Sequence, residues 1–341
     1  MLLPGDDPVA LAQAAKRLAE GELVAFPTET VYGLGARADD DSAVARIFAA
    51  KGRPSDHPLI VHVLDMSDAA LFAQDLSPVA MALMGAFWPG PLTVIVPRAP
   101  GQAAAAAGRH STIGLRCPAH PVAIALLRAA RELGVIGVAA PSANRFGRVS
   151  PTRAAHVASE FGDELLVLDG GDCEVGIESS IVDCSRGQPV LLRPGVITRE
   201  QIEAVAGVAL GRADAAAPRA PGMLEAHYAP AAAVRLLELK ALREALETCQ
   251  QQGQTGVAVY SRTLNPRAGS LDRLMPADAR DAAHELFAVL RALDEAGARQ
   301  IWIEAPAHDA AWDGVRDRLM RAAAATPSPL GGDEKSDLEC S

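Results

Sequence analysis

The stretch over residues 23–63 constrains the fold of this chain more than any other. An apolar run, Leu23–Phe26, is stopped by Pro27 and followed by a polar cluster, Thr28–Thr30, and two nearby glycines. Short apolar runs bounded by turn-forming residues are typical of buried strands. We therefore expect a buried strand that carries hydroxyl groups into a tight loop.

The same stretch continues as a helix with two cations at its end. Asp41 or Ser42 is suited to cap this helix, and Lys51-Gly52-Arg53 stands where it would stop. Alone, the pattern is more typical of an ordinary helix end, because cations complement the negative end of the helix dipole and glycine stops helices. The returning strand, Leu59–Val63, carries His62. Hydroxyls, glycines and cations bracketed by buried strands favour a binding site instead.

Two later strands are also expected to end in a cation. Thr112–Leu115 runs into Arg116, and Val190–Leu192 runs into Arg193. Unpaired burial of a guanidinium costs several kcal/mol, so Arg116 needs an anionic partner. The sequence leaves open whether that partner is a structural carboxylate or a ligand. Several expected buried strands end at Thr, Ser or Arg, and this pattern predicts a cleft lined by strand ends.

A third strand end has the composition of a phosphate-binding loop. Residues 135–140 form an apolar run that leads into Pro141-Ser142-Ala143-Asn144. The commoner meaning of such residues is an ordinary turn. The alternative is a loop whose hydroxyls, amide and N–H groups surround phosphate, helped by a helix that begins near Thr152. Neither glycine-rich nucleotide fingerprint occurs, so any nucleotide is held by a different device.

Composition narrows the function classes. The chain has 341 residues, 49% of them hydrophobic and 22% charged, which is typical of a globular protein with room for two domains. A net charge of −10 argues against an electrostatic nucleic-acid clamp. Five cysteines without C-x-x-C spacing predict a reduced, cytoplasmic protein without a zinc ribbon. The uncharged run over residues 76–97 is interrupted by two prolines, and we expect no membrane span and no export signal.

The second half of the chain has a different organisation. Residues 207–230 are rich in Ala, Pro, Gly and Arg, which is typical of a linker. Strands and helices alternate after it, so we expect a small parallel α/β domain. The division that we predict is a first domain over residues 5–206, a linker and flap over 207–230, a small domain over 231–326 and a disordered tail over 327–341.

Several motifs in this order resemble the YrdC-like family of L-threonylcarbamoyladenylate synthases, in its long two-domain form. The K-x-R signature stands as Lys51-Gly52-Arg53 and the S-x-N signature as Ser142-Ala143-Asn144, with FPTETVYGLG, GLRCP and LRPG between or around them. PGMLEAHYAP, Pro221–Pro230, resembles the family's linker. The resemblance covers residues 5–230 strongly. It implies a twisted mixed-sheet domain with helices, followed by a smaller Rossmann-like α/β domain.

The resemblance also implies a reaction: L-threonine, bicarbonate and ATP give threonylcarbamoyl-AMP and pyrophosphate, with Mg²⁺ as counter-ion. The product would pass to a downstream tRNA threonylcarbamoyl transferase for modification of the adenosine beside the anticodon, and stable nucleic-acid binding is not expected. The residues carried over for threonine are Thr30, His62, Arg116, Ala140 and Ser180. Those carried over for ATP are Arg53, His57, Thr112, Ser142, Ser150, Arg193 and Tyr228. Lys51, Arg53 and Asn144 would steer the phosphates during catalysis, and the metal ligands stay unknown.

Three positions depart from the family pattern. His57 stands in place of an asparagine, Ser179-Ser180 in place of a serine–threonine pair, and Glu225-Ala226 where some relatives have basic residues. Two other functions are alternatives for such a chain. A non-catalytic RNA-binding module is disfavoured by the net charge and by an aromatic content of 4%. A carbamoyl-adenylating enzyme of hydrogenase maturation would carry cysteine-rich zinc modules, and the cysteine spacing of this sequence indicates none.

Overall fold

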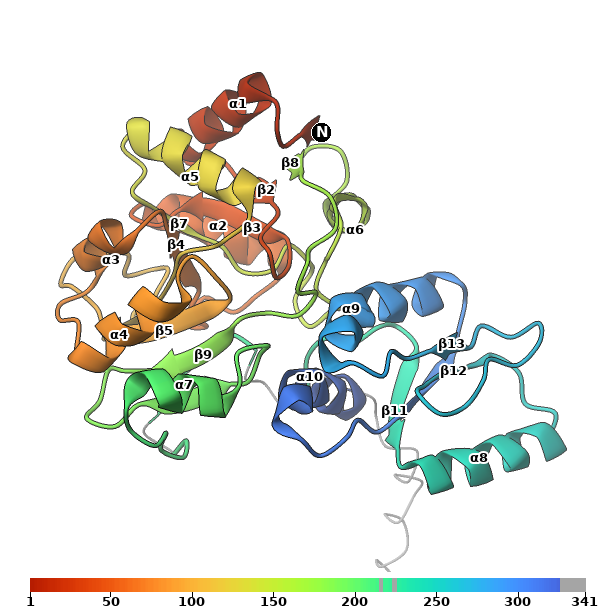
Figure 1. Cartoon of the computed structure of the whole chain (residues 1–341). Helices are drawn as coiled ribbons and strands as arrows, with labels where there is room; N and C mark the ends of the chain where they lie inside the picture. Colours follow the sequence, from red (N-terminus) through yellow and green to blue (C-terminus); the bar gives the residue numbers. More distant parts are fainter. Residues whose placement is uncertain (215–216, 223–225, 326–341) are drawn as a thin grey trace, which may run out of the picture.

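The computed structural model describes residues 1–214, 217–222 and 226–325, which form a large and a small α/β unit (Figure 1). The large unit contains a mixed sheet in the order β1-β8-β2-β3-β7-β4-β6-β5-β9-β10. Its strands are β1 (Leu2–Pro4), β2 (Val24–Phe26), β3 (Gly33–Arg37), β4 (Ile60–Val63), β5 (Leu92–Pro97), β6 (Thr112–Arg116), β7 (Gly137–Ala139), β8 (Leu166–Asp169), β9 (Ser180–Asp183) and β10 (Val190–Arg193). The predicted tail over 327–341 and the linker residues Met223 and Glu225 lie outside the described residues.

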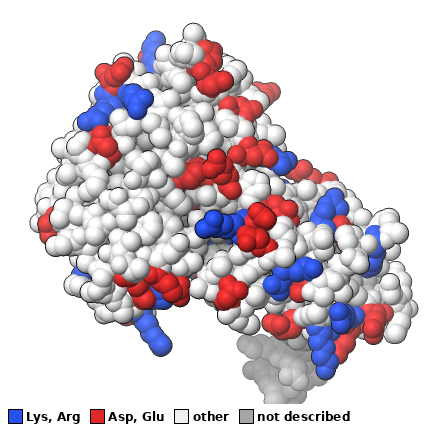
Figure 2. Space-filling model, viewed as in Figure 1, with Lys and Arg blue, Asp and Glu red and all other residues white. Residues whose placement is uncertain are grey.

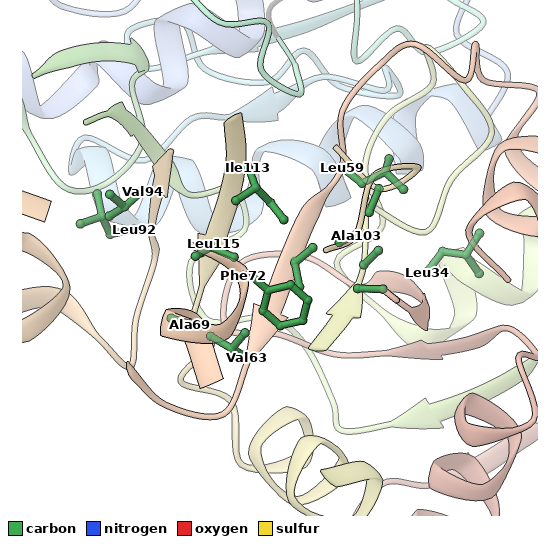
Figure 3. Close-up of a cluster of buried hydrophobic side chains, with 14 of the residues drawn as sticks. Leu34, Leu59, Val63, Ala69, Phe72, Leu92, Val94, Ala103, Ile113 and Leu115 are labelled. Carbon is green, nitrogen blue, oxygen red and sulfur yellow. The ribbon is translucent and has the colours of Figure 1, made fainter. Parts of the chain in front are cut away.

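Helices cover both faces of this sheet. They are α1 (Pro8–Ala19), α2 (Asp41–Lys51), α3 (Met66–Phe72), α4 (Pro78–Phe87), α5 (Pro121–Glu132), α6 (Ala154–Phe161) and α7 (Arg199–Ala206). Side chains alternate across a strand, so Val24 and Phe26 of β2 pack in the core beneath α1 and α5 while Ala25 belongs to the core on the other face. Figure 3 shows part of that second core, where Phe72 of α3 lies among strand residues.

The small unit has a parallel sheet in the order β11-β14-β12-β13. Its elements are β11 (Ala233–Leu237), α8 (Leu239–Gln251), β12 (Val257–Ser261), β13 (Arg273–Leu274), α9 (Ala279–Glu295), β14 (Gln300–Glu304), a 3₁₀ turn (Ala310–Trp312) and α10 (Asp313–Ala324). Helices α9 and α10 lie on the side of this unit that faces the large one (Figure 1). A single hydrophobic cluster joins Ile177 of the large unit to Leu286 and Val315 of the small one.

Residues 23–63 form the predicted strand, helix and returning strand, with two differences. The N-cap of α2 is Asp40, not Asp41 or Ser42, because its carboxylate accepts from the backbone N–H groups of Ser42 and Ala43. The glycines expected in a tight loop begin β3, which pairs antiparallel with β2. A Cβ at Gly35 would lie 2.8 Å from the Phe26 ring, so glycine allows the two strands to approach.

Charged side chains are of mixed sign on the face shown in Figure 2, where Lys and Arg alternate with Asp and Glu. This face carries no continuous basic field of the kind that binds a nucleic-acid backbone. Among the helices that the structure describes, none combines the length and the apolar composition that a bilayer crossing requires.

Candidate active site

A narrow cavity lies where several strands of the large sheet end. Arg116 is the last residue of β6, Arg193 is the last residue of β10, and Ser142 follows β7. The polar loop after β2 contributes Thr28, and β4 contributes His62. Seven of the predicted site residues line this cavity, namely Arg53, His62, Arg116, Ala140, Ser142, Arg193 and Tyr228. The predicted convergence of strand ends is therefore present in the fold.

The linker forms one wall of the cavity. Pro221, Gly222, His227 and Tyr228 all contact it. The free volume is only about 50 Å³, and a second cavity of about 350 Å³ shares Arg53, Gly222 and His227 with it. Since one water needs about 10–15 Å³ on this measure, the first cavity has room for a few waters. The linker occupies space that a larger ligand would need.

Arg116 has the structural partner that the sequence left open. Its Nη2 donates to Glu29 Oε1 at 2.7 Å, and its Nε donates to the Gly90 carbonyl at 3.3 Å. The other oxygen of Glu29 accepts from the backbone N–H of Ala119. Both charged side chains are buried, so the pair is desolvated and compensated. Glu29 fixes the orientation of the guanidinium at the cavity wall.

Arg53 and Arg193 supply two further cations. Burial lowers the pKa of Arg53 to about 10, and its Nε has no hydrogen-bond partner among the described residues. Arg193 donates from Nε to the Ser179 carbonyl at 3.0 Å and from Nη1 to the Pro221 carbonyl at 3.0 Å. Burial also lowers the pKa of Arg193. The two guanidinium groups concentrate positive charge against the linker.

Lys51 and Asn144 lie behind the cavity rather than on its wall. The Lys51 ammonium donates to the carbonyl of Ser142 at 2.6 Å and to that of Asn144. The Asn144 amide donates to the carbonyls of Arg145 and Arg148, while its Oδ1 has no partner in the part of the chain that the structure describes. Burial lowers the pKa of Lys51 well below its usual value. These two side chains brace the Ser142–Asn144 loop.

The predicted threonine residues differ in how free their polar atoms are. His62 lines the cavity with Nδ1 unpartnered among the described residues, and burial, with Arg116 nearby, lowers its pKa to about 3. Thr30 shares a 2.8 Å hydrogen bond with Thr28, and Ser180 donates to the Ile197 carbonyl at 2.8 Å. Ala140 contributes only a methyl group and its backbone. Ser180 is thus engaged in the fold itself.

The remaining predicted ATP residues are dispersed. His57 lines the second cavity beside Phe146. Ser150 is buried and donates to Glu178 at 2.5 Å. Thr112 begins β6, whereas Arg116 ends it, and a strand rise of about 3.3 Å per residue separates them by about 13 Å. Thr112 is not brought to the cavity wall.

Glu178 and His227 also line the cavity, although neither was predicted from the sequence as a site residue. Burial disfavours the charged form of Glu178, but Arg318 and Arg193 more than offset this and lower its pKa to about 2. Burial lowers the pKa of His227 to about 3, which keeps it neutral. The signal for His227 was its place beside Tyr228 in the linker motif. Glu178 gave none, because its partner Arg318 lies 140 positions away.

Unpartnered polar atoms gather at this site. Buried side-chain atoms without a partner, counted over the described residues, include one from each of Arg53, His62, Asn144, His227 and Tyr228. Buried polar groups are normally hydrogen-bonded, since each orphan costs about 1–3 kcal/mol. A cluster of such atoms around one cavity is the arrangement that a polar ligand would satisfy.

The residues offer no dedicated metal cage. Within residues 1–214, 217–222 and 226–325, no group of three or more His, Cys, Asp or Glu side chains is suited to hold a metal ion. The cavity carboxylate, Glu178, already accepts from Ser150 and Arg318. Mg²⁺ commonly binds through substrate phosphates and water, with few protein ligands. The site therefore fits Mg²⁺ only as an ion that arrives with a nucleotide.

Comparison with known proteins places the whole chain in one family. A model described as "Telomere recombination", of the Sua5–YciO–YrdC type, matches residues 16–195, and one described as "Threonylcarbamoyl-AMP synthase, C-terminal domain" matches residues 197–324. The threonylcarbamoyl-AMP synthase of Bacillus subtilis is 42% identical over 94% of each chain. That of Pyrococcus abyssi is 37% identical over 91% of this chain and 92% of its own.

Solved structures agree. The crystal structure of Pyrococcus abyssi Sua5 complexed with L-threonine superposes with a TM-score of 0.83 at 37% identity, covering 92% of this chain and 94% of that one. A form of the same protein with a histidine and a tyrosine replaced by alanine gives a TM-score of 0.84 at 35% identity, over 95% and 96% of the chains. The resemblance and the fold predicted from the sequence are confirmed, and the chain belongs to the family of two-domain, Sua5-type threonylcarbamoyl-AMP synthases.

Proposed function

We propose that this chain joins L-threonine, bicarbonate or CO₂, and ATP into threonylcarbamoyl-AMP and pyrophosphate, for threonylcarbamoyl modification of the adenosine beside the tRNA anticodon. Family membership gives the product, and ATP is the adenylate donor that it requires. The observation that carries the assignment to this site is the cluster of buried, unpartnered polar atoms around a cavity lined by three arginines. The proposal includes a catalytic domain over residues 5–206, a linker and flap over 207–230 and a small domain over 231–326.

Threonine binds, in this proposal, at the Arg116 end of the cavity. Glu29 and Gly90 take two of the five N–H donors of Arg116, and the others can bind a carboxylate in a fixed fork. His62 is kept neutral by burial, so it is suited to hydrogen bonding with the amine, hydroxyl or carbamate rather than to supplying charge. Thr30, Ala140 and Ser180 complete the predicted threonine set.

ATP binds across the two cavities. Its triphosphate takes the place of linker atoms beside Arg53, Arg193 and Ser142, and its adenosine enters the second cavity beside His57 and Phe146. Lys51 and Asn144 hold the Ser142 loop from behind. Ser150 acts through Glu178, and Tyr228 offers its unpartnered hydroxyl. The predicted role of Thr112 stays a prediction, since this strand end does not reach the cavity.

The chemistry that we propose needs positioning and charge neutralisation. The threonine amine attacks the carbon of CO₂ and loses a proton, which gives a carbamate. A carbamate oxygen then bonds to the α-phosphorus of ATP, and the bond to the pyrophosphate oxygen breaks. Negative charge develops on the leaving group, and preorganised cations in a buried site stabilise it. Mg²⁺ that arrives with the nucleotide would supply further charge neutralisation.

The partners are small molecules first. The product is the substrate of a downstream tRNA threonylcarbamoyl transferase, and this chain itself does not hold tRNA in our proposal. The net charge of −10 and the mixed charges of Figure 2 support that separation.

The decisive test is pyrophosphate release with each substrate withheld in turn. We expect release only when threonine, bicarbonate and ATP are all present, and an adenylate product that contains both threonine and carbonate carbon. Equal ATP consumption without threonine or without bicarbonate would contradict the proposal. RNA binding that weakens steeply with salt, without ATP turnover, would support the RNA-binding alternative instead.

A further inference from the structure

Arg318 of α10 is the largest fully buried side chain among the described residues, and it crosses between the two units. Its Nε donates to Glu178 Oε2 at 2.9 Å, and its Nη2 donates to the Glu178 carbonyl at 3.0 Å. Its Nη1 donates to the Pro194 carbonyl at 2.7 Å and to Asp317 at 2.9 Å. One guanidinium of the small unit therefore binds Glu178, the neighbour of the Ser179 that Arg193 contacts, and Pro194, which directly follows Arg193.

Glu178 is the carboxylate that lines the active-site cavity, and its ion pair with Arg318 neutralises its charge and fixes its position. The second oxygen of Glu178 accepts from Ser150, so the ion pair also orients that hydroxyl. Without Arg318, a buried carboxylate would be left beside the cations that we assign to the triphosphate. It would repel phosphate directly, and it would be free to pair with Arg193.

The same helices support the linker. The Arg318 guanidinium lies 5.5 Å from the centre of the Tyr228 ring, and Phe287 of α9 stacks on that ring at 5.4 Å. Tyr228 is fully buried and has a left-handed φ of 62°. Such a backbone is held only where its surroundings determine it. The small unit thus sets the position of a linker side chain that lines the cavity and also belongs to the domain contact.

We propose that Arg318 is a positioning residue for the ATP site: it neutralises Glu178, orients Ser150 and seats Tyr228, so that Arg53 and Arg193 stay available for phosphate. The inference rests on the proposed function, because it concerns the same cavity. It gives the small unit a role in nucleotide binding. That role could not be inferred from its parallel sheet, because the sequence has no glycine-rich nucleotide fingerprint.

The test compares ATP dependence of pyrophosphate release in Arg318→Met and in Arg318→Met/Glu178→Gln, at saturating threonine and bicarbonate. We expect Arg318→Met to raise the KM for ATP at least about tenfold with a smaller change in kcat, because binding is affected before chemistry. Removing the stranded charge in the double variant should recover part of the lost ATP affinity, because the amide oxygen of Glu178→Gln can still accept from Ser150, whereas the contact of Arg318 with Tyr228 stays lost. Arg318→Lys, which keeps the charge with fewer donors, should fall between them.

Arg291→Met is the matched control. Arg291 of α9 is another buried cross-domain guanidinium, and it donates to Glu160 at 2.9 Å and to the Val149 carbonyl. It borders a separate surface hollow with Glu160. We expect this variant to lower the melting temperature but to leave the KM for ATP within about twofold.

Three results would overturn the inference: an unchanged KM in Arg318→Met, a double variant as impaired as the single one, or an equal rise of KM in Arg291→Met. If Arg318→Met does not fold, Arg318→Lys takes its place, and an unchanged KM for ATP in that variant overturns the inference. Direct calorimetric titration with ATP keeps the two proposals apart. A wild type that binds ATP but releases no pyrophosphate would contradict the reaction, whereas the loss of ATP affinity on replacing Arg318 would still hold.

Discussion

Tyr228 carries two costs that a folded chain normally avoids. Its backbone is left-handed, and its buried hydroxyl has no partner within the described residues. Burial, with Glu178 nearby, raises its pKa to about 12, so the hydroxyl is a neutral donor at physiological pH. Strain and unsatisfied polarity of this kind accumulate at functional sites.

We predict that Tyr228→Phe separates stability from function. Removing an unsatisfied buried hydroxyl should leave the free energy of unfolding unchanged or raise it by about 1 kcal/mol. The same change should raise the KM for ATP, because the donor is lost to the ligand. Denaturant melts and ATP kinetics on one preparation measure both. A fall in stability together with unaltered kinetics would mean that Tyr228 contributes to packing and not to ATP binding.

Lys51 and Arg53 look equivalent in the K-x-R signature, and the structure separates them. Replacing Lys51 with Met leaves the carbonyls of Ser142 and Asn144 without their buried donor, so we expect a loss of about 2–3 kcal/mol in unfolding free energy as well as activity. Arg53→Met should abolish turnover with a smaller effect on stability, since the Arg53 guanidinium donates to one carbonyl, that of Pro58 at 2.9 Å, and its Nε has no partner among the described residues. Urea melts of the two variants provide the comparison, and equal destabilisation would contradict it.

Sequence alone could name the cations of the site but not what orients them. Arg116 was expected to need an anion, and its partner, Glu29, is 87 positions away in a loop whose conformation depends on the whole sheet. Sequence patterns report on residues that are close along the chain. Buried ion pairs depend instead on which distant segments the fold brings together. For the same reason, the sequence does not reveal that Arg318 is the partner of Glu178.

At the scale of elements, α10 meets the large unit through a glycine. A Cβ on Gly314 would lie 2.9 Å from the Gly195 carbonyl oxygen and 2.8 Å from Ile177. The helix can therefore approach Gly195, in the segment that follows Arg193, only because residue 314 has no side chain.

We predict that Gly314→Val pushes α10 away and lowers both melting temperature and ATP affinity. The control is Gly85→Ala in α4, where no atom lies within 4 Å of the added methyl group. A helical Gly→Ala change there should stabilise by up to about 1 kcal/mol without altering kinetics. Thermal melts and ATP titrations of both variants check this, and a fully active Gly314→Val enzyme would show that close packing of α10 is not required.

Elements with a strong pattern were the ones that the sequence predicted well. Strands β6 and β10 occupy the expected residues, because short apolar runs bounded by turn-forming residues leave little choice. Strand β3 was missed, since glycines weaken strand propensity and only close contact with Phe26 explains them. Helix α7 was also missed; its capping box at Thr198 and Gln201 was the available signal.

At the scale of the whole molecule, the buried histidines make the fold sensitive to acid. His62 and His227 have pKa values of about 3, lowered by burial, whereas the unfolded chain protonates near 6.5. Between these values the unfolded state binds more protons, so stability falls as the pH drops from 6.5 towards 3. The slope is at most about 1.4 kcal/mol per pH unit for each histidine. Below about 4.5, protonation of Glu178 in the unfolded chain adds to the loss.

We expect urea midpoints to fall steeply between pH 6.5 and 5, and the slope to be smaller in a His62→Gln/His227→Gln variant. Melts at constant ionic strength measure this. A midpoint independent of pH across that range would mean that these histidines stay exposed to protons in the folded chain.

The tightness of the cavity has a chemical consequence. The proposed product is a mixed anhydride of a carbamic acid and a phosphate, a linkage that bulk solvent hydrolyses. The described part of the linker fills space that this product needs, so in our proposal the linker moves aside to admit it and then closes over it, which shelters the bond from water. The loss of intermediate to hydrolysis is then governed by how long the linker stays seated, and not by the speed of bond formation.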